Sequence, residues 1–95
     1  MKPKDYIAQN GIDFFEVNKG KTITIRLQSV DELVLTGYYI GISHVGDYLP
    51  LIDGLLIEEP QYNLHMMYKN PDDGRLIALN INLLLIDDMS DIKFE

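Results

Sequence analysis

His44 and His65 are the two histidines of the chain, and an imidazole can bind a metal ion or exchange a proton near neutral pH. A metal site would need further ligands at a recognisable spacing, such as His-x-x-x-His or a carboxylate cluster, and neither histidine has them. His65 falls in an alternating stretch, where a packed or solvent-facing role is more common. The sequence therefore predicts structural roles for both histidines and no metal site.

Carboxylates are the other groups able to do acid–base chemistry, and several of them occur as adjacent pairs. The pairs are Asp31-Glu32, Glu58-Glu59, Asp72-Asp73 and Asp87-Asp88. Neighbouring side chains on a strand point to opposite faces, so such a pair does not converge as a catalytic dyad. The chain also has no cysteine, no Gly-x-Ser-x-Gly and no phosphate-binding loop. These absences predict a protein that is not an enzyme and needs no cofactor.

Length and composition predict one small domain. The 95 residues are 46% hydrophobic, which is enough for a core, although a domain of this size buries a modest share of its surface. The lack of cysteine fits a reducing compartment. The first residues hold no apolar stretch of signal-peptide length, and the longest apolar runs, such as Leu83 to Ile86, are too short to span a bilayer. We therefore expect a cytoplasmic protein.

The chain is acidic, with a formal net charge of −7 from 15 acidic and 8 basic residues. Such a chain repels the phosphate backbone of nucleic acids unless its few cations gather on one face. Five of the basic residues lie in the first third of the sequence: Lys2, Lys4, Lys19, Lys21 and Arg26. Acidic residues dominate from Asp47 onward, so the two signs of charge could occupy different faces.

The first third predicts a helix followed by a strand. Pro3 suits a first helical turn and Asn10-Gly11 a helix end, so we expect a helix over residues 3–10. Residues 12–17 fit either a further helical turn or a short strand. Residues 22–27 alternate apolar and polar side chains, which predicts a half-buried strand.

The middle of the chain is β-prone. Residues 33–43 form a long run that contains Gly37 and Gly41. Glycine inside a strand usually marks a sharp bend or a close backbone approach, so this strand is expected to curve strongly. Residues 48–58 add a further β-prone stretch.

The last third completes the expected domain. Residues 62–69 predict another strand, and residues 75–87 predict the last strand or strand pair. Residues 88–95 form an acidic tail that is expected to fray. We therefore predict a mostly β chain with a single domain over residues 1–95. A bent antiparallel sheet would close into a small barrel within residues 21–87.

Two stretches resemble a known family. Gly20 to Leu27 resembles the first strand of Sm and Sm-like proteins, and Thr36 to Ser43 resembles their second, glycine-bent strand. The helix and the closing segment from Asn82 to Ile86 occur in the family's order. The resemblance implies a five-stranded SH3-like barrel capped by the short helix. It also implies a homo-oligomeric ring of five to seven subunits, in which the fourth strand of one subunit pairs with the fifth of the next.

The closing apolar segment fits such a ring independently. Leu83, Leu84, Leu85 and Ile86 would be apolar on both faces of a strand, and a lone exposed edge of this kind is an aggregation hazard. Pairing with a second copy of the chain would satisfy its backbone groups and bury both faces. These four residues are therefore the predicted oligomer interface.

The sequence departs from the family at the residues that bind RNA. The resemblance implies an acid, then an aromatic residue or Met, then Asn after the second strand. Ser43 replaces the acid, Tyr48 is the candidate stacking residue, and Leu49-Pro50 stands where Asn would bind a base. In the second motif Leu79-Asn80-Ile81-Asn82 replaces Arg-Gly and its Asn-containing turn, so Asn82 alone matches.

Two hypotheses about function follow. In the first, a ring binds single-stranded RNA with weakened or altered specificity. Bases would stack near Tyr48, Asn82 would read them, and Lys21 or Arg26 would contact phosphate. In the second, the ring is a protein-interaction scaffold that has lost the nucleic-acid pocket and meets a basic protein partner. The family resemblance favours RNA, whereas the charge and the missing Arg-Gly favour the scaffold.

Overall fold

The computed structural model describes residues 1–28, 31–48, 51–52, 55–56 and 59–95, with side chains described outside residues 45–60. Two short helices precede the strands, and two 3-10 turns, η1 and η2, lie near the end of the chain. The elements in order are α1 (Pro3–Asn10), α2 (Asp13–Val17), β1 (Thr22–Leu27), β2 (Leu33–Tyr48), β3 (Leu51–Ile52), β4 (Leu55–Leu56), β5 (Glu59–Lys69), β6 (Leu76–Asn82), η1 (Leu83–Leu85), η2 (Met89–Asp91) and β7 (Ile92–Phe94).

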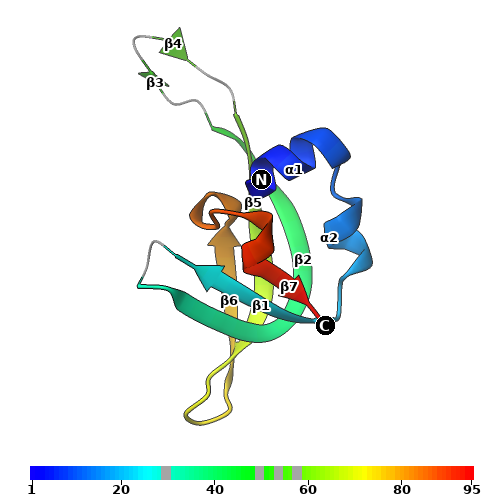
Figure 1. Cartoon of the computed structure of the whole chain (residues 1–95), viewed down its shortest axis with the longest axis vertical. Coiled ribbons are helices and arrows are strands. Elements are labelled where there is room, and N and C mark those ends of the chain that lie inside the picture. The colour runs from blue at the N-terminus through cyan, green and yellow to red at the C-terminus, as the bar shows by residue number, and fades with distance from the viewer. Residues whose placement is uncertain (29–30, 49–50, 53–54, 57–58) are drawn as a thin grey trace.

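Five antiparallel strands form the main sheet in the order β6-β5-β2-β1-β7 (Figure 1). The expectation of a mostly β chain with an N-terminal helix over residues 3–10 is confirmed, and residues 13–17 form a helix rather than a strand. A separate hairpin, β3 with β4, stands away from the sheet (Figure 1). Of the β-prone stretch at 48–58, residues 49–50, 53–54 and 57–58 lie outside the described residues. No pairing of β6 with β7 closes the described sheet, so the predicted barrel closure is absent from the single chain.

β2 is the strand that bends, because it pairs with β1 along one half and with β5 along the other. Gly37 pairs with both neighbours, opposite Ile23 and Tyr68. A Cβ at Gly37 would lie 2.0 Å from the carbonyl oxygen of Met67, so only glycine fits there. The register then shifts between Tyr39 and Gly41. The close backbone approach expected at these glycines is confirmed at Gly37, whereas a Cβ at Gly41 would meet only the side chain of Lys19.

The core lies on one face of this bent sheet. On β1, Ile23, Ile25 and Leu27 are buried, whereas Arg26 between them is exposed, as the alternation predicted. We call the face that carries Arg26 the outer face. The helices cover one end of the core through Phe15 and a set of edge-to-face aromatic contacts. Because α1 and α2 contribute few buried residues each, strand side chains make up most of the core.

The strand predicted through Ile86 is wrong beyond Asn82, where the chain turns into η1. The Asn82 Oδ1 atom accepts a hydrogen bond from the Leu84 N–H at 3.0 Å and so caps this turn. Residues three apart lie on the same face of a 3-10 turn. Leu83 and Ile86 are therefore buried, at 2% and 1% exposure, while Leu84 and Leu85 remain 44% and 49% exposed.

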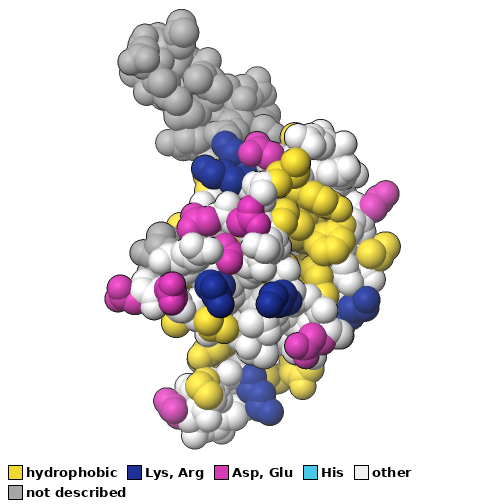
Figure 2. Space-filling model, in the orientation of Figure 1, with side chains coloured by type: hydrophobic (Ala, Val, Ile, Leu, Met, Phe, Trp, Pro, Cys, Tyr) yellow, Lys and Arg dark blue, Asp and Glu magenta, His cyan; other side chains and the backbone are white. Residues whose placement is uncertain are grey.

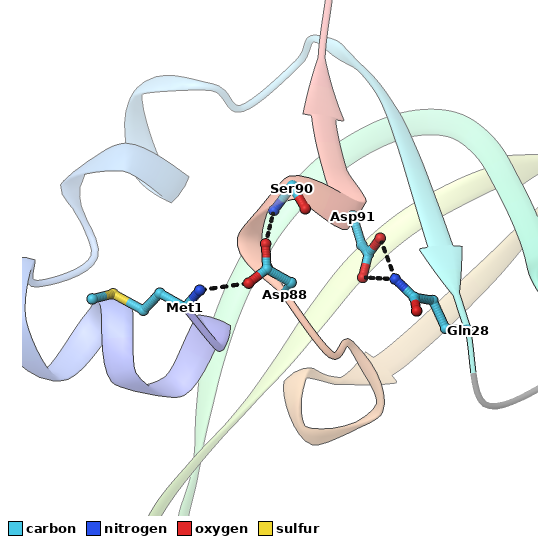
Figure 3. Close-up of polar contacts among 5 residues, drawn as sticks. All are labelled: Met1, Gln28, Asp88, Ser90 and Asp91. Carbon is cyan, nitrogen blue, oxygen red and sulfur yellow. Dashed lines mark hydrogen bonds and ion pairs between the residues drawn. The ribbon is translucent and has the colours of Figure 1, made fainter.

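The tail predicted to fray is instead ordered, and this expectation is wrong. Asp88 accepts hydrogen bonds from the Met1 amino group at 2.5 Å and from the Ser90 N–H at 2.9 Å (Figure 3). These hydrogen bonds, from the amino group first, hold the pKa of the Asp88 carboxyl well below its usual range. β7 then pairs with β1 and buries Ile92. Residues 88–95 are acidic overall, but Ile92 and Phe94 alternate with a polar residue in the way that is typical of a short strand.

Candidate functional site

The residues predicted to contact RNA are spread over the sheet. Arg26 is exposed in β1, opposite Val34, and Lys21 is exposed just before that strand. Asn82 ends β6, and β2 and β5 stand between β6 and β1 in the sheet. The fold therefore does not bring the two candidate cations next to Asn82 within the sheet order.

Asn82 already uses both ends of its amide within the chain. Its Nδ2 donates to the Gln61 Oε1 atom at 2.8 Å, and its Oδ1 caps η1 through Leu84. A base would have to compete with both contacts. The Tyr48 backbone pairs with Glu59 at the end of β2, but the Tyr48 side chain lies outside the described residues. RNA binding at these residues stays a prediction.

A polar ladder that sequence reasoning missed crosses β2, β5 and β6. The Ser43 Oγ atom lies 2.7 Å from His65 Nε2, and His65 Nδ1 lies 2.6 Å from Asn80 Oδ1. Because Asn80 Oδ1 only accepts, we assign the proton to Nδ1, which leaves Nε2 to accept from the Ser43 hydroxyl. These residues come from three different strands, so no local sequence motif predicts that they lie together. The alternation of polar residues Gln61, Asn63 and His65 was the available signal.

This ladder has the order of a nucleophile, a base and an orienting group. Acyl transfer would also require N–H donors that converge on an oxyanion. The three side chains join β2, β5 and β6 on one face, and a slip of the register by one residue would send each to the other face. The structural role expected for His65 stays a prediction, and its ring links Ser43 of β2 to Asn80 of β6.

A hollow of about 380 Å³ opens on the outer face over β1, β7 and η2. Basic side chains lie over this part of the surface, with acidic side chains around them (Figure 2). Its lining includes Thr24 and Arg26 from β1, Asp91 at the end of η2, and Lys93 from β7. Lys93 is paired with Thr24 across the β1–β7 ladder. β7 was predicted to be a frayed tail, and so the sequence could not indicate this surface.

The two edges of the sheet, β6 and β7, are the other notable surface. β6 reads Leu-Ile-Ala-Leu-Asn-Ile-Asn, without a charge or a proline. Leu76 and Ile77 are 50% and 42% exposed along it. Natural edge strands are usually protected by charge, proline, a bulge or shortness, and β7 has two of these protections, its length of 3 residues and the charge of Lys93. β6 is an unprotected edge.

The predicted oligomer interface splits in two. Leu83 and Ile86 belong to the core, so their side chains offer almost no surface to a neighbouring subunit. Leu84 and Leu85 are exposed just beyond the end of β6 and extend its apolar surface. The candidate interface therefore moves to β6 itself together with Leu84 and Leu85.

One buried polar group lacks a partner. The Tyr39 hydroxyl has no hydrogen bond within the described part of the chain, although the side chain is buried beside Phe94. Burial, with the Glu16 carboxylate in addition, raises the pKa of this hydroxyl well above its ordinary value. A neutral but unsatisfied hydroxyl destabilises the fold by its lost hydration.

Tyr39→Phe is accordingly expected to raise the free energy of unfolding by about 1 kcal/mol, because it removes the unsatisfied group and keeps the ring. Urea unfolding followed by circular dichroism measures the change. Tyr38→Phe is the matched control: Tyr38 is 49% exposed, and its loss of a hydroxyl should leave stability nearly unchanged. A destabilised Tyr39→Phe variant would contradict the assignment of an unpaired hydroxyl.

Within the described ranges, no group of three or more His, Asp or Glu residues is placed to hold a metal ion. Among the described helices, none has both the length and the apolar character needed to cross a membrane. No family model matches the chain, and comparisons with curated proteins and with solved structures found no match either. The reading of function therefore depends on the residues and geometry above.

Proposed function

We propose that this chain is a non-catalytic, Sm-like scaffold protein that works as a homo-oligomeric ring, in which the β6 edge of each subunit pairs with the β7 edge of the next. The observation that carries the proposal is the uncharged, half-exposed β6 edge. Pairing would satisfy its free backbone groups and cover Leu76 and Ile77.

The strand order supports this arrangement. Counted in chain order, the strands of the main sheet are β1, β2, β5, β6 and β7, so the fourth and fifth are its two edges. The Sm-like resemblance implies that these strands meet between subunits. Because both edges belong to the same antiparallel sheet, joining them head to tail would continue the sheet from subunit to subunit, and a suitable rotation closes a ring.

The charge supports a scaffold that meets a basic protein more than one that binds RNA. Each subunit carries a net charge of −7, and a ring multiplies it. Repulsion of phosphate backbones grows with that charge. Asn82, the residue that matches the RNA-binding pattern, is engaged by Gln61 and by the backbone of η1. A partner with exposed lysine and arginine residues is the complementary surface.

Engineered cysteines test the pairing directly, because the chain has none of its own. Side chains on the same face of two paired strands lie close enough for a disulfide in the right register. Lys93→Cys on β7 is combined in turn with Leu76→Cys, Ala78→Cys or Asn80→Cys on β6, all on the outer face. Under mild oxidation, one of these combinations is expected to give a ladder of linked chains on a denaturing gel, ending at the ring size.

Ile77→Cys with Lys93→Cys is the matched control, since Ile77 neighbours the outer-face positions but points to the other face of β6. It should give no ladder. Internal disulfides within single chains would show that β6 meets its own β7 and would contradict the proposal, as would the absence of linked chains in all three outer-face combinations.

A further inference from the structure

The hollow on the outer face is lined by two cations that form no ion pair with any carboxylate in the described part of the chain. Arg26 and Lys93 come from neighbouring strands, and Lys93 lies opposite Thr24, two residues from Arg26. Such a diagonal pair is close enough for its charges to interact. Neither cation forms an ion pair with a described carboxylate, in a chain with almost twice as many acids as bases. Two like charges held together without a partner favour an anionic ligand.

Asp91 also lines the hollow but does not serve as that partner. Its two carboxylate oxygens each accept a hydrogen bond at 3.0 Å from the Gln28 Nε2 atom (Figure 3). The carboxylate is thus directed at Gln28, and its buried position belongs to the anchoring of η2. Arg26 and Lys93 remain available to a ligand on the outer side.

The other groups around the hollow can donate hydrogen bonds to an anion. Thr24 Oγ1 lies 3.3 Å from Thr36 Oγ1, and because one proton suffices to join two hydroxyls, the other is free to point at a ligand. Ser90 adds a hydroxyl and Val34 an apolar wall. Arginine, lysine and hydroxyls together are the usual set around a phosphate group. The volume of about 380 Å³ suits a small molecule.

We propose that this hollow binds the phosphate group of a small phosphate monoester, held by Arg26 and Lys93 with the Thr24 hydroxyl. The residues that line the hollow all come from one chain, but Lys93 lies on the β7 edge that the proposed ring pairs with β6, so the hollow would border that interface. The hollow differs from an RNA-binding surface, because the two cations converge on one hollow and do not form a track along the sheet.

Titration of the purified chain with inorganic phosphate at pH 7.5, followed by proton–nitrogen NMR, tests the proposal. Saturable shifts are expected in the backbone signals of Thr24, Arg26 and Lys93. Arg26→Gln with Lys93→Gln should lower the affinity at least tenfold. Lys69→Gln with Arg75→Gln is the matched control, because it removes the same charge from exposed residues outside the hollow and should change the affinity less than twofold.

The outcomes of this titration distinguish binding of a small phosphate group from binding of a nucleic-acid backbone. Saturation by inorganic phosphate that is lost in the hollow variant, and kept in the control, supports the site. Lys93→Gln alone, which changes one exposed side chain, repeats the test should the double variant not fold. Shifts that do not saturate, or that weaken equally in both double variants, overturn the proposal. Binding of oligo-uridine through Arg26 and Lys93 without any binding of inorganic phosphate would assign the surface to nucleic acid and also overturn it.

Discussion

Gly37→Ala is expected to destabilise the fold on the order of 3 kcal/mol, the upper range for forcing an extra carbon into a packed site. The new Cβ would lie 2.0 Å from the Met67 carbonyl oxygen and 2.8 Å from its carbonyl carbon. These are backbone atoms of the paired strand β5, so no side chain can move aside. Urea unfolding measures the loss, and an unfolded variant at zero denaturant would be the extreme form of the same result.

Gly74→Ala separates crowding from backbone strain. Gly74 has a φ of +74°, and a Cβ there would have no atom within 4 Å. Alanine at this position should therefore lower the free energy of unfolding only through its unfavourable left-handed conformation, by about 1 kcal/mol. Gly37→Ala is expected to lower the free energy of unfolding clearly more than Gly74→Ala does. Equal losses in the two variants would mean that β2 and β5 are not in close contact at Gly37, and the bend that shapes the sheet would be misplaced.

Adding lysine to the β6 surface is expected to take the oligomer apart. Leu76→Lys with Leu85→Lys places two charges on exposed apolar positions at the proposed interface, and charged side chains are a common protection of edge strands. Both side chains are about half exposed, so the fold should survive. The mass in solution should fall from several chains to one chain of 10.9 kDa.

The matched control adds the same charge elsewhere. Ile12→Lys with Val17→Lys changes two exposed apolar residues at and beside α2, away from both sheet edges. This variant should keep the mass of the wild-type assembly. Loss of assembly in both double variants would trace the effect to net charge, and retention in both would remove β6 from the interface.

Much of the local structure could be predicted from the sequence. The alternation in residues 22–27, Pro3 at the helix start and the two glycines in residues 33–43 each have a local physical cause. The helix over 3–10 and the strand over 22–27 formed where expected, whereas the strand expected over 33–43 continues to Tyr48. The end of the chain could not be predicted in the same way. The pattern of Leu83 to Ile86 predicts a strand, but Asn82 caps a 3-10 turn there, and the amide of Asn82 is also hydrogen-bonded to Gln61 of β5, far away in the sequence.

The candidate surfaces were harder to predict than the local elements, because each is formed by strands that are distant in the sequence. The Ser43, His65 and Asn80 ladder joins three strands, and the hollow needs β7 beside β1. A local sequence pattern predicts neither the register of the strands nor the structure of the acidic C-terminal segment. Both depend on contacts between residues up to 87 positions apart, such as the contact between Met1 and Asp88. The sequence indicated that Arg26 contacts phosphate near Asn82. In the sheet, however, β2 and β5 lie between the strand of Arg26 and the strand of Asn82.

Light scattering coupled to size-exclusion chromatography of the wild-type chain at micromolar concentration measures whether the subunits assemble through β6. One species with the mass of five to seven copies is expected, because the uncharged β6 edge with its exposed Leu76 and Ile77 favours pairing with a neighbour. A folded species of 10.9 kDa at that concentration would contradict it, since an uncovered β6 edge would then be stable alone.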